Sequence, residues 1–281
     1  MQWWCAARGT AWTWTWQAYP GVWLFVLVVG LAYWRLFGRG WSPVAQREAG
    51  SEESGSEPGV PPRGWPGWFV AGVLCLWLAL DWPIGALGAG YLASVHMLQF
   101  VLIALVAPPL MLLGIPAGRP ELRPRSRGLA RLATHPLITL VAFNLVIIFT
   151  HLPSVVDSLM ASQLGSFLVD MVWLAGGLVF WWPIILDSPA RPGFGRPLKI
   201  GYLILATIVN TGTFLYLTFS ELPVYSTYEL AAPVYGIAAR DDQRVAGLLM
   251  KAGTAAVLWT AIGILFFLWY REENKDEPAS T

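Results

Sequence analysis

Charged residues are scarce in this sequence. Only 12% of its 281 residues are Asp, Glu, Lys or Arg, and 56% are hydrophobic, whereas an ordinary soluble protein has about 25% charged residues. A soluble domain of this length has too little interior to bury so many apolar side chains, which excludes a water-soluble fold. A lipid bilayer supplies the apolar surroundings that such a chain needs.

Cysteine and long basic runs are also lacking. The two cysteines, Cys5 and Cys75, are far apart and neither belongs to a Cys-x-x-Cys pair, so the sequence predicts neither a disulfide framework nor a thiolate metal site. The net charge is +1 and no basic run indicates nucleic-acid binding. Because no stretch resembles a phosphate-binding loop, a nucleophile elbow or a zinc-protease helix, we do not expect an enzyme.

Long apolar runs make up most of the chain, and seven of them can cross about 30 Å of hydrocarbon. They are residues 18–37, 65–84, 91–115, 136–152, 165–186, 200–220 and 245–270. The 17 tryptophans agree with this interpretation, since indole rings favour the membrane–water boundary. The predicted fold is all-α, a polytopic membrane bundle of about seven transmembrane helices.

The chain divides into four predicted parts. Residues 1–40 form an outer N-terminal segment and the first helix, and the absence of a signal-peptide cleavage pattern predicts that this helix is retained. Residues 41–64 are rich in Ser, Glu, Gly and Pro and form a disordered cytoplasmic linker. A six-helix membrane domain spans 65–270, and a polar cytoplasmic tail spans 271–281.

Basic residues predict the orientation, because Lys and Arg concentrate on the cytoplasmic side of membrane proteins. Fourteen of the 18 lie near the inner ends of the helices or in the segments after the first, third, fifth and seventh helices, five of them between 119 and 131. We therefore predict an external N-terminus and a cytoplasmic C-terminus.

Four ionisable residues fall in the outer third of the predicted helices: Asp81, His96, His151 and Asp170. Their depths agree at 1.5 Å of rise per residue, and a charge that faced lipid would be costly. We expect His96, His151 and Asp170 to converge in one outward-facing pocket, with Asp81 and Met97 nearby. Such a group could bind a metal ion or relay protons, and a thioether would favour copper(I).

Simpler interpretations of these residues stay open. A histidine at a helix end, such as His151, can lie among lipid headgroups, and Met97 can serve packing alone. His96 lies deeper, which favours a functional role. His135 precedes Pro136 on the predicted cytoplasmic side, where we expect it to cap the helix.

Two adjacent prolines, Pro108 and Pro109, fall within the third predicted helix. Proline has no N–H and clashes with the preceding turn, so the pair should kink or break this helix. The helix should also lie inside the bundle, because neighbouring helices must satisfy the freed carbonyl groups.

Four motifs resemble, in order, those of the CtaG-like family of cytochrome c oxidase assembly proteins of bacterial plasma membranes. The first is SVHMLQFVLIALVAPPLMLLGIP, from Ser94, and the second is FTHLPSVVD, which ends at Asp157. The third is AGGLVFWWPII, and the fourth is RDDQRVAGLLMK, with Asp242 and Gln243 at the matching places. The likeness covers about residues 65–270.

The chain departs from the family pattern at two places. The second histidine expected four residues after His96 is Phe100, and a histidine pair in the fifth helix corresponds to Ser166 and Asp170. This removes imidazoles four residues apart on one helical face, which form a natural bidentate metal site. A carboxylate in their place favours ions harder than copper(I).

The resemblance implies a membrane assembly factor for a haem–copper cytochrome c oxidase. Such a protein assists copper insertion or subunit maturation at the outer face of the plasma membrane. Its partners would be an oxidase subunit or other assembly factors, and copper is the candidate metal. The assembly role carries over to this chain more directly than the copper chemistry does.

Two alternatives belong to other classes. A small-solute or ion transporter would need polar residues near the bilayer midplane, broken helices and internal repeats, and only Asn210 and Thr211 provide such a feature. An interfacial membrane enzyme could use one of the outer histidines as a base and one of the outer aspartates as an acid.

Reporter fusions test the predicted orientation. A reporter inserted between residues 119 and 131 should be active only as a cytoplasmic reporter, and one inserted after Glu221 only as an external reporter. A pair of enzymes that are active on opposite sides of the membrane provides the measurement. The reverse pattern would contradict the orientation and the depths assigned to the histidines.

Overall fold

The computed structural model is an all-helical bundle, and the residues that it describes contain no β-strand. These residues are 2–7, 9–38, 64–116, 135–186, 194–209 and 211–274. The predicted linker, 41–64, lies outside them except for its last residue, and the predicted tail is described only as far as Asn274.

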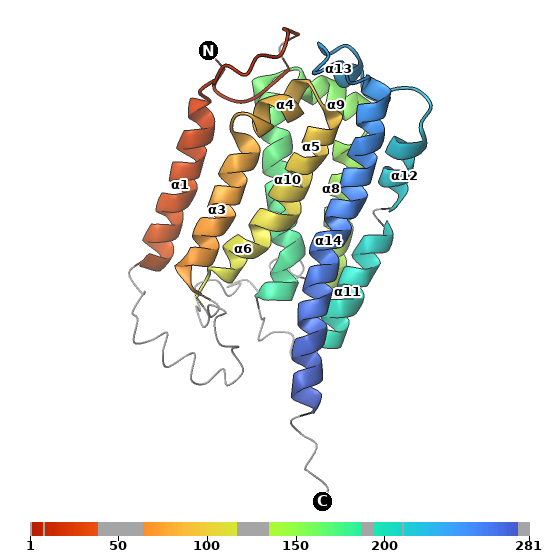
Figure 1. Ribbon diagram of the computed structural model, residues 1–281. Helices are drawn as coiled ribbons and strands as arrows, with labels where there is room; N and C mark the ends of the chain where they lie inside the picture. The colour runs from red at the N-terminus through yellow and green to blue at the C-terminus, as the bar shows by residue number, and fades with distance from the viewer. Residues whose placement is uncertain are drawn as a thin grey trace, which may run out of the picture.

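The long helices run roughly along one common direction, and short helices such as α4, α9 and α13 lie at one end of the bundle (Figure 1). In chain order they are α1 (Pro20–Phe37), α3 (Pro66–Leu80), α4 (Ile84–Gly90), α5 (Ala93–Phe100), the π-helix η2 (Val101–Val106), α6 (Ala107–Leu113), α8 (Pro136–Thr150), α9 (Pro153–Met160), α10 (Gln163–Ile185), α11 (Arg196–Val209), α12 (Thr211–Phe219), α13 (Ser226–Glu229) and α14 (Ala239–Glu273). Four of them, α1, α3, α8 and α9, have proline as their first residue, where the missing N–H would have had no helical partner anyway.

Five helical stretches are long and apolar enough to cross a membrane, by length and composition: α1, α5 to α6, α10, α11 to α12, and α14. The pairs α3–α4 and α8–α9 bring the number to seven if each is one span, bent by 48° and 70° respectively. The predicted class, a bundle of about seven transmembrane helices, is therefore confirmed.

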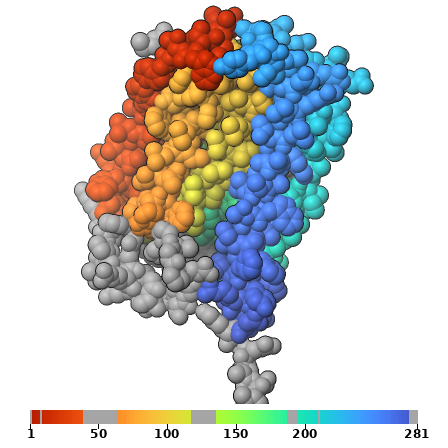
Figure 2. All heavy atoms as spheres, viewed as in Figure 1, coloured from red at the N-terminus to blue at the C-terminus, as the bar shows by residue number. Residues whose placement is uncertain are grey.

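The two ends of the bundle differ (Figures 1 and 2). The N-terminal segment and the segment around α13 close one end, next to α4 and α9, and α14 ends at the other. We refer to the end with the N-terminal segment as the outer end, following the orientation predicted from the basic residues. Which end faces the cytoplasm stays a prediction.

The continuous stretch α5–η2–α6 is the centre of the bundle. The apolar segment of this stretch that can cross a membrane is 67% buried, whereas that of α1 is 11% buried. This confirms that the third predicted helix lies inside the bundle. α14 packs on α5, α3 packs on α6, and α10 packs on both η2 and α6.

Regular α-helix is interrupted directly before the proline pair, and a kink at the pair itself stays a prediction. Pro108 and Pro109 lie in the first turn of α6, directly after η2. There the Ala107 N–H donates to the Leu102 carbonyl, five residues back rather than four. The irregular hydrogen bonding starts at Val101, earlier in the chain than the prolines themselves, because the turn before a proline cannot complete the α-helical pattern.

Gly177 of α10 lies against this irregular turn. A Cβ at Gly177 would lie 2.2 Å from the carbonyl oxygen of Ala104 and 2.7 Å from Cγ of Pro108. Ala104 is four residues before Pro108, so its carbonyl is one that the missing proline N–H leaves without an α-helical donor. Only glycine lets the α10 backbone approach the central helix this closely.

Replacing Gly177 with alanine should therefore destabilise the bundle. We expect Gly177→Ala to lower the free energy of unfolding by about 1–3 kcal/mol, the usual cost of overpacking. Gly176→Ala is the matched control, since its Cβ would meet no atom closer than 3.4 Å and alanine favours helix over glycine by about 0.5–1 kcal/mol. Thermal unfolding in detergent would measure both; equal midpoints would contradict the packing argument.

Candidate functional site

Three helices bring two histidines to one tryptophan at the outer end of the bundle. His96 lies on α5, His151 directly follows α8, and Trp173 lies on α10. The ring centroids of His96 and His151 lie 4.9 and 6.0 Å from that of Trp173. All three side chains are buried. The structure thus places the two histidines together, although 55 positions separate them in the sequence.

Aromatic rings surround this histidine pair. The Phe100 ring lies edge-on to His151, with centroids 5.2 Å apart, and also contacts Trp173. The Tyr228 ring lies 5.8 Å from His96. Phe100, which replaces the second family histidine, is therefore a wall of the pocket against His151. The surroundings of the histidine pair are apolar and closed.

Each histidine has one ring nitrogen without a partner. Nδ1 of His151 lies 2.7 Å from the carbonyl oxygen of Ile147. A carbonyl can only accept, so Nδ1 carries the proton and Nε2 carries the lone pair. Nε2 of His151 and Nε2 of His96 are both buried and have no hydrogen-bond partner among the described residues. A buried lone pair without a donor can bind a metal ion or a proton.

The two aspartates of the predicted pocket bond to indoles. Oδ2 of Asp170 accepts a 2.8 Å hydrogen bond from Nε1 of Trp4. Oδ2 of Asp81 accepts one of the same length from Nε1 of Trp23 in α1. Both donors come from the first 38 residues of the chain, which lie on the outside of the core helices.

The structure brings two of the three predicted metal ligands, His96 and His151, against one tryptophan, Trp173. Among the described residues, no three His, Cys, Asp or Glu side chains lie close enough to share a metal ion. The histidines meet at Trp173, while the carboxylate of Asp170 is directed to Trp4. Met97, expected nearby, is fully buried in the hydrophobic core.

The N-terminal segment is a part of the site that sequence reasoning missed. The Trp3 N–H donates to Oε1 of Gln163 at 2.7 Å, and the Cys5 thiol donates to the Leu80 carbonyl. Trp4 is 1% exposed and packs edge-on against Phe167, with centroids 4.9 Å apart. The segment therefore lies across the outer ends of α3 and α10. Five tryptophans among the first 16 residues were the signal for it, because so much indole surface in a loop needs a place to pack.

Asp242 of the fourth motif fixes the start of α5. Its carboxylate accepts hydrogen bonds from the backbone N–H of Ala93, at 2.6 Å, and of Ser94, and also from the Ser94 hydroxyl. These N–H groups belong to the first turn of α5 and have no partner within the helix. His96 follows two residues later, so Asp242 holds the helix that carries this histidine.

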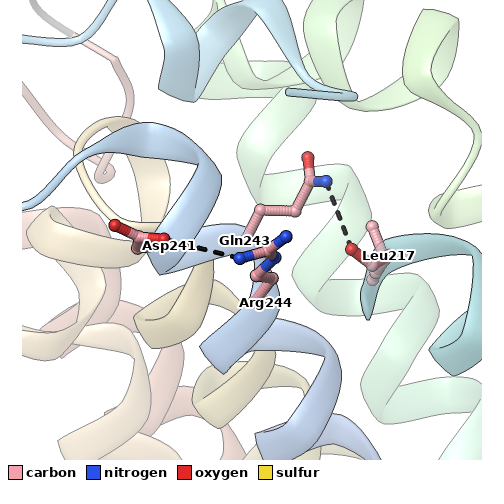
Figure 3. A network of polar contacts seen from close by, with 4 residues as sticks. All are labelled: Leu217, Asp241, Gln243 and Arg244. Atoms are coloured by element: carbon pink, nitrogen blue, oxygen red, sulfur yellow. Dashed lines mark hydrogen bonds and ion pairs between the residues drawn. The ribbon is translucent and has the colours of Figure 1, made fainter. Parts of the chain in front are cut away.

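Gln243 of the same motif joins α14 to the end of α12. Its Nε2 donates to the Leu217 carbonyl at 3.2 Å (Figure 3). Its Oε1 accepts from the Val224 N–H at 2.6 Å. The neighbouring pair Asp241 and Arg244, also drawn in Figure 3, is exposed and 3.9 Å apart, which is a weak contact. The buried residues of this motif, Asp242 and Gln243, thus hold neighbouring segments of the bundle together.

Two tyrosines of the segment before α14 close the outer end. The Tyr225 hydroxyl donates to the His151 carbonyl at 3.0 Å, and the Tyr228 hydroxyl donates to the Gly88 carbonyl at 2.7 Å. Burial raises the pKa of both phenols above the usual value, so both keep their protons and remain donors. This segment therefore anchors the backbone beside the histidine pair.

The polar feature behind the transporter alternative contributes to a helix contact. Nζ of Lys251 in α14 lies 2.8 Å from Oγ1 of Thr211 and 3.3 Å from the carbonyl of Thr207. It thus joins α14 to both α11 and α12. Asn210 lies outside the described residues.

Comparison with known families gives one match. The model of the family described as cytochrome c oxidase caa3 assembly factor, Caa3_CtaG, matches residues 35–272. The match includes the histidine pair and the Asp242–Gln243 motif, and it starts after Trp4 and Trp23. No curated protein and no solved structure matches the chain significantly.

The bond between Trp4 and Asp170 should contribute to stability. Trp4→Phe removes the donor from a buried carboxylate and should lower the free energy of unfolding by about 1–3 kcal/mol. Trp14→Phe is the control, because Trp14 also donates a hydrogen bond, to Tyr235, but is 53% exposed; we expect a change below about 0.5 kcal/mol there.

A double-mutant cycle separates this hydrogen bond from the packing of the ring. In the Asp170→Asn background the cost of Trp4→Phe should shrink, since the acceptor is no longer a carboxylate. Thermal unfolding of the four proteins in detergent provides the measurement. An unchanged cost would mean that Trp4 acts through packing alone.

Proposed function

The chain belongs to the cytochrome c oxidase caa3 assembly factor family, and from this premise we propose that it assists oxidase maturation by holding copper(I) between His96 and His151. In this proposal copper is a cargo that the protein receives at the outer face of the bacterial plasma membrane and passes on. The observation that carries the proposal is the pair of buried Nε2 atoms without partners.

The donor set fits copper(I) better than the sequence alone implied. The carboxylate of Asp170, which would favour a harder ion, is engaged by Trp4. The two remaining donors are neutral imidazoles, which suit copper. Copper(I) has a filled d shell and accepts two ligands in line, so a histidine pair is a sufficient site.

The surroundings of His151 are those of a metal-binding histidine. Its Nδ1–H donates to the Ile147 carbonyl, an arrangement that fixes the ring and directs the lone pair of Nε2 outward from that bond. The apolar rings of Phe100 and Trp173 restrict water, which influences the redox behaviour of a bound metal. Two ligands also hold a metal less tightly than the four of a structural site, as delivery requires.

The other functions considered receive less support. An interfacial enzyme would pair a histidine with a nearby acid, but Asp81 and Asp170 bond to indoles. A transporter would use the polar residues of α11 and α12, but Thr211 bonds to Lys251. We therefore propose an assembly factor without a catalytic reaction, whose partners are an oxidase subunit or other assembly factors.

Copper binding by histidine variants tests the proposal. The purified chain, loaded anaerobically with copper(I), should hold about one copper ion, and His96→Ala or His151→Ala should each weaken binding by at least roughly tenfold because one of two ligands is lost. His135→Ala is the matched control, since His135 is exposed and caps α8 by accepting from the Leu137 N–H.

Complementation provides the second measurement. In a strain that lacks the gene, the wild type and the His135 variant should restore oxidase activity, whereas the His96 and His151 variants should restore little. If these two variants bound no copper but restored full activity, copper handling would be excluded and only a role in subunit maturation would remain.

A further inference from the structure

A cavity opens at the opposite end of the bundle from the histidines. It has a volume of about 1000 Å³ and lies between α6, α10, α11 and α14. α14 packs on α5 and η2. Further from the histidines α14 lies apart from α6, and Figure 2 shows part of α10 between α6 and α14. The cavity is distinct from the histidine site.

The walls of this cavity are apolar along most of its length. They include Leu110 and Leu113 of α6, Ile184 of α10 and Ala261 of α14. Along α14 the lining residues extend from Ala256 to Glu272, roughly 24 Å at 1.5 Å per residue. This is about half of the 40–45 Å thickness of a bilayer with its headgroups, which is the length of one lipid leaflet.

Charged groups lie at one end of the cavity. Arg196 and Lys199 of α11 and Glu272 of α14 line it there. Nη1 of Arg196 forms an ion pair with Glu272, and the Arg196 side chain is 32% exposed. A guanidinium has five N–H donors, so Arg196 can bind a second anion while it stays paired with Glu272.

The indole of Trp181 also belongs to the wall and is 2% exposed.

We propose that this cavity binds one phospholipid with an anionic headgroup. The acyl chains occupy the apolar part, and the phosphate lies at Arg196 and Lys199. The predicted orientation puts this end of the bundle in the cytoplasmic leaflet, whose surface is negative. The proposal is independent of copper.

Lipid binding to the purified full-length chain tests this proposal. The chain is delipidated in detergent and given palmitoyl-oleoyl-phosphatidylglycerol or palmitoyl-oleoyl-phosphatidylcholine in mixed micelles, and native mass spectrometry counts the bound lipid. The wild type should retain one phosphatidylglycerol in preference to phosphatidylcholine. Arg196→Gln and Lys199→Gln together should weaken phosphatidylglycerol binding by roughly tenfold, while Arg244→Gln, at the other end of α14, should not.

A bulky substitution separates binding in the cavity from binding to the outer surface of the helices. Ala261→Trp adds a large side chain to the wall of the cavity and should weaken retention of the lipid. Gly263→Trp places the same side chain two residues further along α14, where a Cβ meets open space, and should leave retention unchanged. If the double charge variant does not fold, Lys199→Gln alone decides the headgroup assignment.

Two results would overturn the proposal. Unchanged phosphatidylglycerol retention by Ala261→Trp would show that the lipid lies elsewhere. Equal retention of the two lipids by the wild type would show that the charged end does not select an anionic headgroup. Because no step involves copper or an oxidase, failure here and failure of the proposed function are separate results.

Discussion

Polar groups inside a membrane bundle have no water to bond with, and the outer end of this protein is organised by that constraint. Asp170 and Asp81 each accept from an indole N–H, Asp242 accepts from the first turn of α5, and Gln243 bonds to carbonyl and N–H groups of neighbouring segments. Leaving such groups unpaired in hydrocarbon costs several kcal/mol each, by typical transfer values. Several buried polar atoms of the described residues nevertheless have no partner, among them Oδ1 of Asp81 and Nε2 of His96 and of His151. The two histidines differ from the others because both rings contact the same tryptophan, Trp173.

The sequence was sufficient for the helices and for the depth of the histidines. Hydropathy and a fixed rise per residue are local quantities, so they placed the seven apolar segments and put His96 and His151 at one level. The proline pair likewise indicated the irregular turn, because proline lacks a backbone N–H in any structure. Gly177 could not be foreseen, since its role depends on the carbonyl of a residue 73 positions earlier in the chain.

For the same reason, the hydrogen-bond partner of Asp170 could not be predicted from the sequence. Trp4 and Asp170 are 166 positions apart, and no periodicity relates a loop to a helix at that distance. The carboxylate at the site of a family histidine was therefore interpreted as a weak metal ligand. In the structure it is the acceptor for a tryptophan from outside the family match. This chain thus has both an aspartate, Asp170, at the place of a family histidine and an N-terminal segment whose Trp4 bonds to that aspartate.

The bond between Asp242 and α5 has a consequence for biosynthesis. Asp242 is at the start of α14, and it fixes the first turn of the helix that carries His96. During translation α5 is made well before α14, so the first turn of α5 lacks this acceptor until α14 has been inserted. The helix that carries His96 therefore reaches its final arrangement only after a segment almost 150 positions later in the chain has joined the bundle.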